Sequence, residues 1–279
     1  MDGKLAITPG GPRLRSEVHL VAPGETLVVA KRIETLIASS KRAGRPDGAN
    51  WITAAWLDMA GTLIRSFVTT WKVPEAPTTQ SSQLLYLFCG IEPADASTIV
   101  QPVLQWGDSG ADEDGVNRTG QFWTVASWIV PAPDGHTYHT PHVRVSPGDT
   151  LVGAITLTKK SKGGYIYRCE FHGQAATKFT TPTISELIWC VETLEAYELG
   201  GGLEPPYDLN SAFEYPAVKF TAFEGINVSF DGTLADARWT KTDYETKFGE
   251  FTQLVTNSVS NGSILIHYRA NNAAKGPLA

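Results

Sequence analysis

The chain has 279 residues, of which 42% are hydrophobic and 19% charged, so it can bury a sizeable core as one large all-β domain or two small domains. Its formal charge of −6 and pI near 5.5 exclude a general nucleic-acid or anionic-membrane surface, because phosphate binding requires clustered Lys and Arg. No apolar run reaches the length that crosses a membrane, so we expect no membrane partner.

Residues 1–49 are expected to form an appendage to the main domain. Pro23 and Gly24 mark a turn between two apolar, strand-like stretches. The basic stretch 34–48 has no periodicity and is interpreted as a linker or exposed loop. The amino terminus lacks the continuous apolar segment of a signal peptide, so we expect a cytoplasmic protein, or a secreted one if the chain is processed.

Residues 50–279 are predicted to form an all-β domain, an antiparallel two-sheet β-sandwich with little helix. Runs rich in aromatic and β-branched residues alternate with Gly- and Pro-containing turns along this part of the chain. Within it, residues 50–61 and 62–77 are predicted to pair as a hairpin about Ala60 and Gly61.

The stretch 185–199 fits two kinds of element. Its apolar and acidic residues recur at roughly helical spacing, but they also alternate as they would on a strand. One alternating set contains Glu186, Ile188, Cys190 and Glu192, and the other contains Leu187, Trp189 and Val191. The β-rich context favours a strand.

Residues 84–107 predict two buried strands joined by the short acidic loop 92–96, and the second strand carries Gln101 and Gln105. Strand side chains alternate between faces, so both glutamines share a face that Val100, Pro102, Leu104 and Trp106 do not. A neutral amide on a sheet can hold a ligand or a reacting carbonyl, whereas the alternative is a solvated polar face.

Eight tryptophans are many for this length, and several lie beside polar residues on predicted strands. Exposed aromatic rings stack on sugars and on hydrophobic small molecules. The candidate ligand-binding residues are therefore Gln101, Trp71, Trp106, Trp128 and Trp189. The alternative for each tryptophan is a place in the core of the sandwich.

No metal or other cofactor is expected. The three cysteines have no CxxC spacing, and either one disulfide with a free thiol or three buried thiols would fit. His136, His139 and His142 recur at three-residue intervals, but His136 and His139 would diverge on a strand, which favours a polar loop over a metal site.

Several short motifs follow one another over about residues 50 to 230: NWITAAW, FVTTWKVPEAP, LFCGIEP, PVLQWG, VSPGDTL, SELIWCVE and YPAVKFTAF. Their order resembles that of the eqolisins, the glutamic peptidases. The family's A-I-L-Q-T-G strand resembles PVLQWG, which aligns its functional glutamine with Gln105. Its A-E-W-I-V-E strand resembles SELIWCVE, which aligns the second glutamate with Glu192 and leaves Glu186 as the alternative carboxyl.

This resemblance implies a concanavalin A-like sandwich whose concave sheet carries the active site. A glutamate would activate water and then protonate the leaving amine, while the glutamine amide would bind the developing oxyanion. One departure concerns the first glutamate of the family motif, because Ile188 precedes Trp189 here. The predicted catalytic residues are Gln105, Glu192 and Glu186.

Three functions remain open from the sequence. The leading one is a glutamic-peptidase-like hydrolase that acts on peptides. The second is a non-proteolytic sandwich that binds a glycan or a small hydrophobic ligand in an aromatic-lined cleft. The third is a cyclase or isomerase acting on a small molecule in the same cleft.

Overall fold

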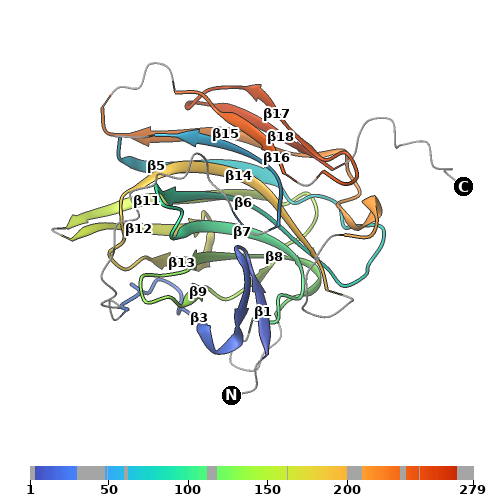
Figure 1. Ribbon diagram of the computed structural model, residues 1–279, viewed down its shortest axis with the longest axis horizontal. Helices are drawn as coiled ribbons and strands as arrows, with labels where there is room; N and C mark the ends of the chain where they lie inside the picture. The colour runs from blue at the N-terminus through green and yellow to red at the C-terminus, as the bar shows by residue number, and fades with distance from the viewer. Residues whose placement is uncertain are drawn as a thin grey trace, which may run out of the picture.

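The computed structural model describes residues 4–29, 48, 50–59, 62–111, 118–161, 163–199, 209–232, 237–244 and 246–268. The predicted all-β architecture is confirmed, since these residues form two large sheets packed as a sandwich and contain no α-helix (Figure 1). In this part of the chain no helix is long and apolar enough to cross a membrane. Most of the predicted linker 34–48 lies outside the described residues.

The larger sheet has nine strands, and all its pairings are antiparallel except that of β3 with β9. Along the sheet the order is β16 (Thr240–Asp243), β4 (Trp51–Asp58), β14 (Leu187–Glu198), β6 (Gln83–Pro93), β7 (Ile99–Gly107), β8 (Gly120–Val130), β9 (Thr137–His139) and β3 (Val18–Leu20), with β10 (Val143–Arg144) also paired to β8.

The smaller sheet has seven antiparallel strands. Their order is β13 (Gln174–Thr180), β12 (Gly164–Phe171), β11 (Thr150–Ser161), β5 (Ile64–Lys72), β15 (Phe220–Phe230), β18 (Gly262–His267) and β17 (Phe251–Thr256). The main core fills the space between the sheets, where Leu87 and Leu104 of the larger sheet and Phe67 and Ile155 of the smaller are buried.

The two strands predicted from residues 84–107 are confirmed as β6 and β7, which pair antiparallel. Residues 187–198 form a strand, β14, and not a helix. The predicted hairpin of residues 50–61 with 62–77 is wrong: β4 pairs with β14 and β16, whereas β5 pairs with β11 and β15 in the other sheet. Both segments have apolar residues suited to the core, so each can face it from a different side.

The amino-terminal residues pack against the sandwich in two ways. A two-stranded hairpin, β1 (Leu5–Thr8) and β2 (Gly11–Leu14), pairs with neither large sheet. It lies instead over the face of the larger sheet that is turned away from the smaller one, where Ala6 and Ile7 form a second core with Tyr86, Val103 and other buried residues (Figure 1). We call this side of the sheet the hairpin-covered face.

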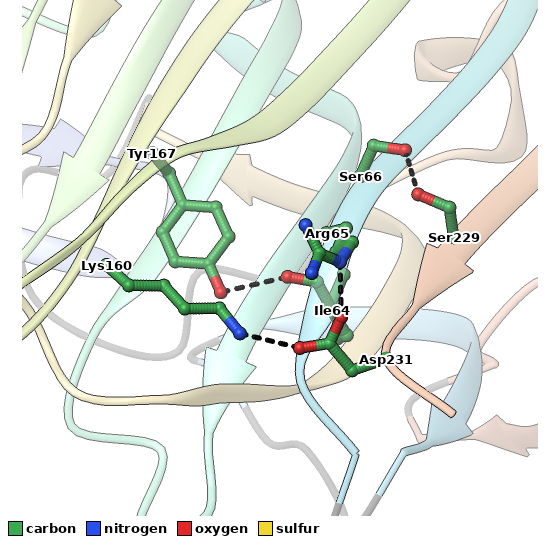
Figure 2. Close-up of polar contacts among 7 residues, drawn as sticks. All are labelled: Ile64, Arg65, Ser66, Lys160, Tyr167, Ser229 and Asp231. Carbon is green, nitrogen blue, oxygen red and sulfur yellow. Dashed lines mark hydrogen bonds and ion pairs between the residues drawn. The ribbon is translucent and has the colours of Figure 1, made fainter. Parts of the chain in front are cut away.

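Three charged residues on the smaller sheet form a cluster of ion pairs. Asp231 follows β15 and contacts Arg65 of β5 and Lys160 of β11, the latter at 2.7 Å (Figure 2). These two cations hold the pKa of Asp231 below its usual value. Because the pairs are exposed to solvent, they are worth little to stability, and the carboxylate offsets the basic charge at this place.

Cys89, Cys169 and Cys190 are all free and buried, which resolves the choice between a disulfide and three thiols. Burial raises the pKa of each thiol, so very little reactive thiolate is present at neutral pH. We expect a thiol reagent at pH 8 to modify none of them in the native chain within minutes and all three in denaturant. Rapid labelling of the native chain, followed by mass spectrometry, would contradict this placement.

Candidate functional site

Alternation along β7 separates its apolar and polar side chains as predicted. Val100 and Leu104 enter the main core, whereas Val103 belongs to the second core under the hairpin. Gln101 and Gln105 flank Val103 at two-residue spacing, so both amides face the hairpin-covered side. Both are buried, which excludes the alternative of a solvated polar face.

Gln105 is held at both ends of its amide. Its Nε2 donates to the carbonyl of Gly107 at 2.9 Å, and its Oε1 accepts from Nε2 of His142 at 3.0 Å. These two bonds fix the orientation of the amide and use one of its N–H groups. Gln105 is therefore built into the sheet and the adjoining loop, and the described residues show no hydrogen bond between the hairpin and its amide.

Gln101 contacts the hairpin directly. Its Nε2 donates to the carbonyl oxygen of Pro9 at 2.8 Å. Its Oε1 is buried and has no hydrogen-bond partner in the described structure. An unpartnered buried amide oxygen is costly, so this end of Gln101 can still accept a hydrogen bond from a ligand or a water.

Glu195 of β14 supplies a carboxyl on the same face. It lies opposite Tyr86 of β6, whose other neighbour is Gln105, so the two strands place Glu195 and Gln105 in one transverse row. Its Oε1 accepts from the backbone N–H of Gly10 at 3.0 Å and from the hydroxyl of Tyr197. Burial raises the pKa of Glu195 to about 8, although these hydrogen bonds oppose the rise.

Together Gln101 and Glu195 bracket one peptide bond of the hairpin, the bond between Pro9 and Gly10. The amide of Gln101 donates to its carbonyl oxygen, and the carboxyl of Glu195 accepts from its N–H. These are the two atoms that gain charge or a proton when a peptide bond is hydrolysed: the oxygen becomes an oxyanion and the nitrogen becomes an amine.

A cavity of about 110 Å³ adjoins this peptide bond. Pro9, Gly10 and Gln101 line it, as do Trp51 and Glu92. Because roughly 10–15 Å³ is enough to hold one water, the cavity has room for several. Water can therefore lie beside the bracketed carbonyl.

Neither glutamate predicted from the sequence pairs with Gln105. Glu192 lies between Cys190 and Leu194 in the alternation of β14, and both of these belong to the main core. This alternation points Glu192 between the sheets, where burial raises its pKa well above the usual value. Neither oxygen of its carboxyl has a hydrogen-bond partner in the described structure. Glu186 precedes β14 and is exposed.

The candidate tryptophans divide between the two faces. Trp71 packs against Phe171 and Phe223, and Trp106 packs against Trp123, all in the main core. Trp128 stacks on His139 at 4.4 Å on the hairpin-covered face, which Trp189 shares through its alternation with Val191. Seven of the eight tryptophans are buried, the exception being Trp56, so these rings offer little surface for stacking on a sugar.

His136 and His139 diverge as expected. His136 contacts His19 of β3, with 2.8 Å between Nδ1 and Nε2. His139, at the end of β9, stacks on Trp128 and lies beside His142, with 5.2 Å between the two imidazole ring centroids. Burial lowers the pKa of His139 to about 3, so its ring is neutral. The described residues contain no group of three or more His, Cys, Asp or Glu placed to hold a metal ion.

These features define an all-β sandwich protein whose polar face presents an amide and a carboxyl to a covering peptide. Among solved structures, the chain is similar to scytalido-glutamic peptidase with a transition-state analog inhibitor (18% identity, TM-score 0.46) and with a peptide-based analog (18%, 0.47). It is also similar to SCP-B, a member of the eqolisin family, in a complex with the tripeptide Ala-Ile-His (15%, 0.44).

Each of these alignments covers 79% of this chain and 98% of the other. The resemblance to eqolisins seen in the motifs is thus accompanied by a structural similarity between divergent chains. No protein-family model matches the chain, and no curated protein matches it by sequence.

Proposed function

We propose that this chain is a peptide-bond hydrolase of the glutamic-peptidase kind in which Glu195 and Gln101 act together. The observation that carries the proposal is the bracketing of the Pro9–Gly10 peptide bond, whose oxygen contacts Gln101 at 2.8 Å and whose nitrogen contacts Glu195 at 3.0 Å. A substrate peptide in the position of this bond would meet an oxyanion donor on one side and a proton donor on the other.

In the first step, the carboxylate of Glu195 takes a proton from a water that has entered the site beside the bound peptide, while the water oxygen attacks the carbonyl carbon. The carbonyl oxygen becomes the oxyanion and is stabilised by the N–H of Gln101. In the second step, Glu195 returns the proton to the amide nitrogen as the carbon–nitrogen bond breaks. The products are a carboxylic acid and an amine, and Glu195 is again ionised.

The pKa of Glu195 suits a group that changes protonation state during the reaction. In the covered site burial raises it to about 8, so the carboxyl is protonated at neutral pH and below. When the hairpin opens and water enters, the penalty of burial falls, and the pKa moves back toward its usual value. The open site therefore holds the carboxylate before a peptide binds, and this ionisation of the free enzyme governs kcat/KM.

The test compares the two glutamines of β7 in the full chain. We expect fragments of a denatured protein substrate between pH 3 and 8, and Gln101→Ala to lower kcat/KM by roughly 10²–10³ as removal of an oxyanion donor does. Gln105→Ala is the matched control, because that amide contacts Gly107 and His142 and not the bracketed peptide.

Equal losses in the two variants, with their folds intact by circular dichroism, would contradict the role of Gln101. No cleavage by the full chain or by a variant with a displaced hairpin would remove the proposed hydrolysis.

A further inference from the structure

We infer that the hairpin occupies the position of a peptide ligand, and that the site prefers peptides with an apolar residue two positions before proline and a glycine directly after it, as in Ile-Thr-Pro-Gly. This inference rests on the proposed function for the place of the scissile bond. It adds the substrate class and a specificity-determining residue, Val130.

Main-chain contacts hold the hairpin at two places, in β1 and at the turn that follows it. Near its middle, the N–H of Ile7 donates to the carbonyl of Ser109 at 2.8 Å, and the carbonyl of Ile7 accepts from the hydroxyl of Tyr86 at 2.6 Å. At its end the peptide bond of Pro9 and Gly10 is bracketed as described above. Contacts to backbone atoms are available to any peptide in the same conformation, so another chain can take the hairpin's place.

The side chain of Ile7 supplies the apolar preference. Ile7 and the neighbouring Ala6 are buried in the second core, where they contact the hairpin-covered face near Tyr86 and Val103. Burying a side chain of this size strengthens binding by roughly tenfold to a hundredfold. A ligand with a polar residue at this position would lose that contribution.

Glycine is required after the proline for two independent reasons. Gly10 has φ of 129°, a conformation that other residues rarely adopt. A Cβ at this position would lie 3.0 Å from Cγ1 of Val130, closer than an ordinary contact. Val130 therefore limits the size of the residue on the amine side of the scissile bond.

The experiment uses the full chain with Ile7→Asp, which places a charge where the hairpin is buried and should displace it. The probe is a fluorescent peptide with the sequence LAITPGGPRL, which is that of residues 5–14. We expect the variant to bind it saturably and the unaltered chain to bind it at least about tenfold more weakly, because its own hairpin competes. Ile7→Ser, which shortens the same hairpin side chain without adding a charge, is the milder variant if Ile7→Asp does not fold.

The matched control is the same peptide with alanine in place of the glycine that corresponds to Gly10. We expect it to bind about tenfold more weakly, because of both the backbone strain and the contact with Val130. Adding Val130→Ala should narrow that difference by removing the contact and leaving the strain.

Failure of both folded variants to bind the peptide would overturn the inference, as would equal binding of the two peptides. Binding without cleavage would leave the inference standing and remove the proposed hydrolysis. Cleavage of denatured protein with no preference for glycine after the scissile bond would support the proposed hydrolysis and overturn the inferred specificity.

Discussion

Replacing Glu195 with glutamine is expected to lower peptide hydrolysis by roughly 10²–10⁴, the usual contribution of a general acid–base group, and to leave the fold in place. The amide oxygen of glutamine can still accept from the N–H of Gly10 and the hydroxyl of Tyr197, so the local hydrogen bonds survive. What is lost is the ability to take a proton from water and return it to the amine.

The measurement is kcat/KM as a function of pH, with thermal unfolding recorded for both chains. The unaltered chain should show the ionisation of Glu195 in its pH–rate profile, and Glu195→Gln should not. The matched comparison is Glu192→Gln, which changes the same kind of side chain on the same strand but on the face that points into the main core. If Glu192→Gln abolished hydrolysis and Glu195→Gln did not, the assignment of the carboxyl would be reversed.

The stability of the native chain is expected to fall as pH rises from about 6.5 to 8, because two buried carboxyls stay protonated while the unfolded chain ionises them. Burial raises the pKa of Glu195 to about 8 and that of Glu192 well above its usual value of 4.5. A carboxyl whose pKa is raised by folding contributes stability below its unfolded pKa, and this contribution is lost as pH rises toward the folded pKa.

In this pH range each carboxyl that stays protonated in the native chain lowers the free energy of unfolding by about 1.4 kcal/mol for each unit of rising pH. Burial lowers the pKa of His139 to about 3, so this side chain makes stability depend on pH only below its unfolded pKa of 6.5. It therefore does not contribute to the slope between pH 6.5 and 8.

Urea unfolding at pH 6.5, 7.2 and 8 measures this slope. Glu192→Gln should remove the contribution of one carboxyl and make the free energy of unfolding less dependent on pH. Glu186→Gln is the control, because Glu186 is exposed just before the same strand. A slope unchanged by Glu192→Gln would mean that Glu192 is already ionised in the native chain.

The parts of the fold that follow from alternation were predictable from the sequence. The spacing of Gln101, Val103 and Gln105 gives their shared face correctly, and the alternation of residues 189–197 identifies β14 as a strand. Alternation does not say which of the two faces meets the core. On β14 the core side carries Cys190, Glu192 and Leu194, so the predicted glutamate points away from both glutamines.

Glu195 was missed because it lies beyond the family-like motif. The sequence does contain a signal for Glu195, because Glu195 alternates on β14 with Val191 and Tyr197, which face the hairpin. It also pairs with Tyr86 of β6, the strand that precedes β7. The role of the hairpin was not predictable from local patterns, because its contacts join residues far apart in the sequence, 185 positions in the case of Gly10 and Glu195. The placement of β4 and β5 in different sheets was missed for the same reason, because both strands pair with segments far away in the sequence.

The amino-terminal segment has two parts that are held differently: the hairpin of β1 and β2 covers the larger sheet, and β3 pairs in parallel with β9 at its edge. Cleavage between Pro9 and Gly10 would detach the strand that fills the site but leave β3 bonded along the margin of the sheet. Without β3, the backbone groups of β9 on that side would be open to pairing with another molecule, a known route to aggregation. The proposed cleavage would thus release the peptide that covers the site and keep the strand that protects the edge of the sheet.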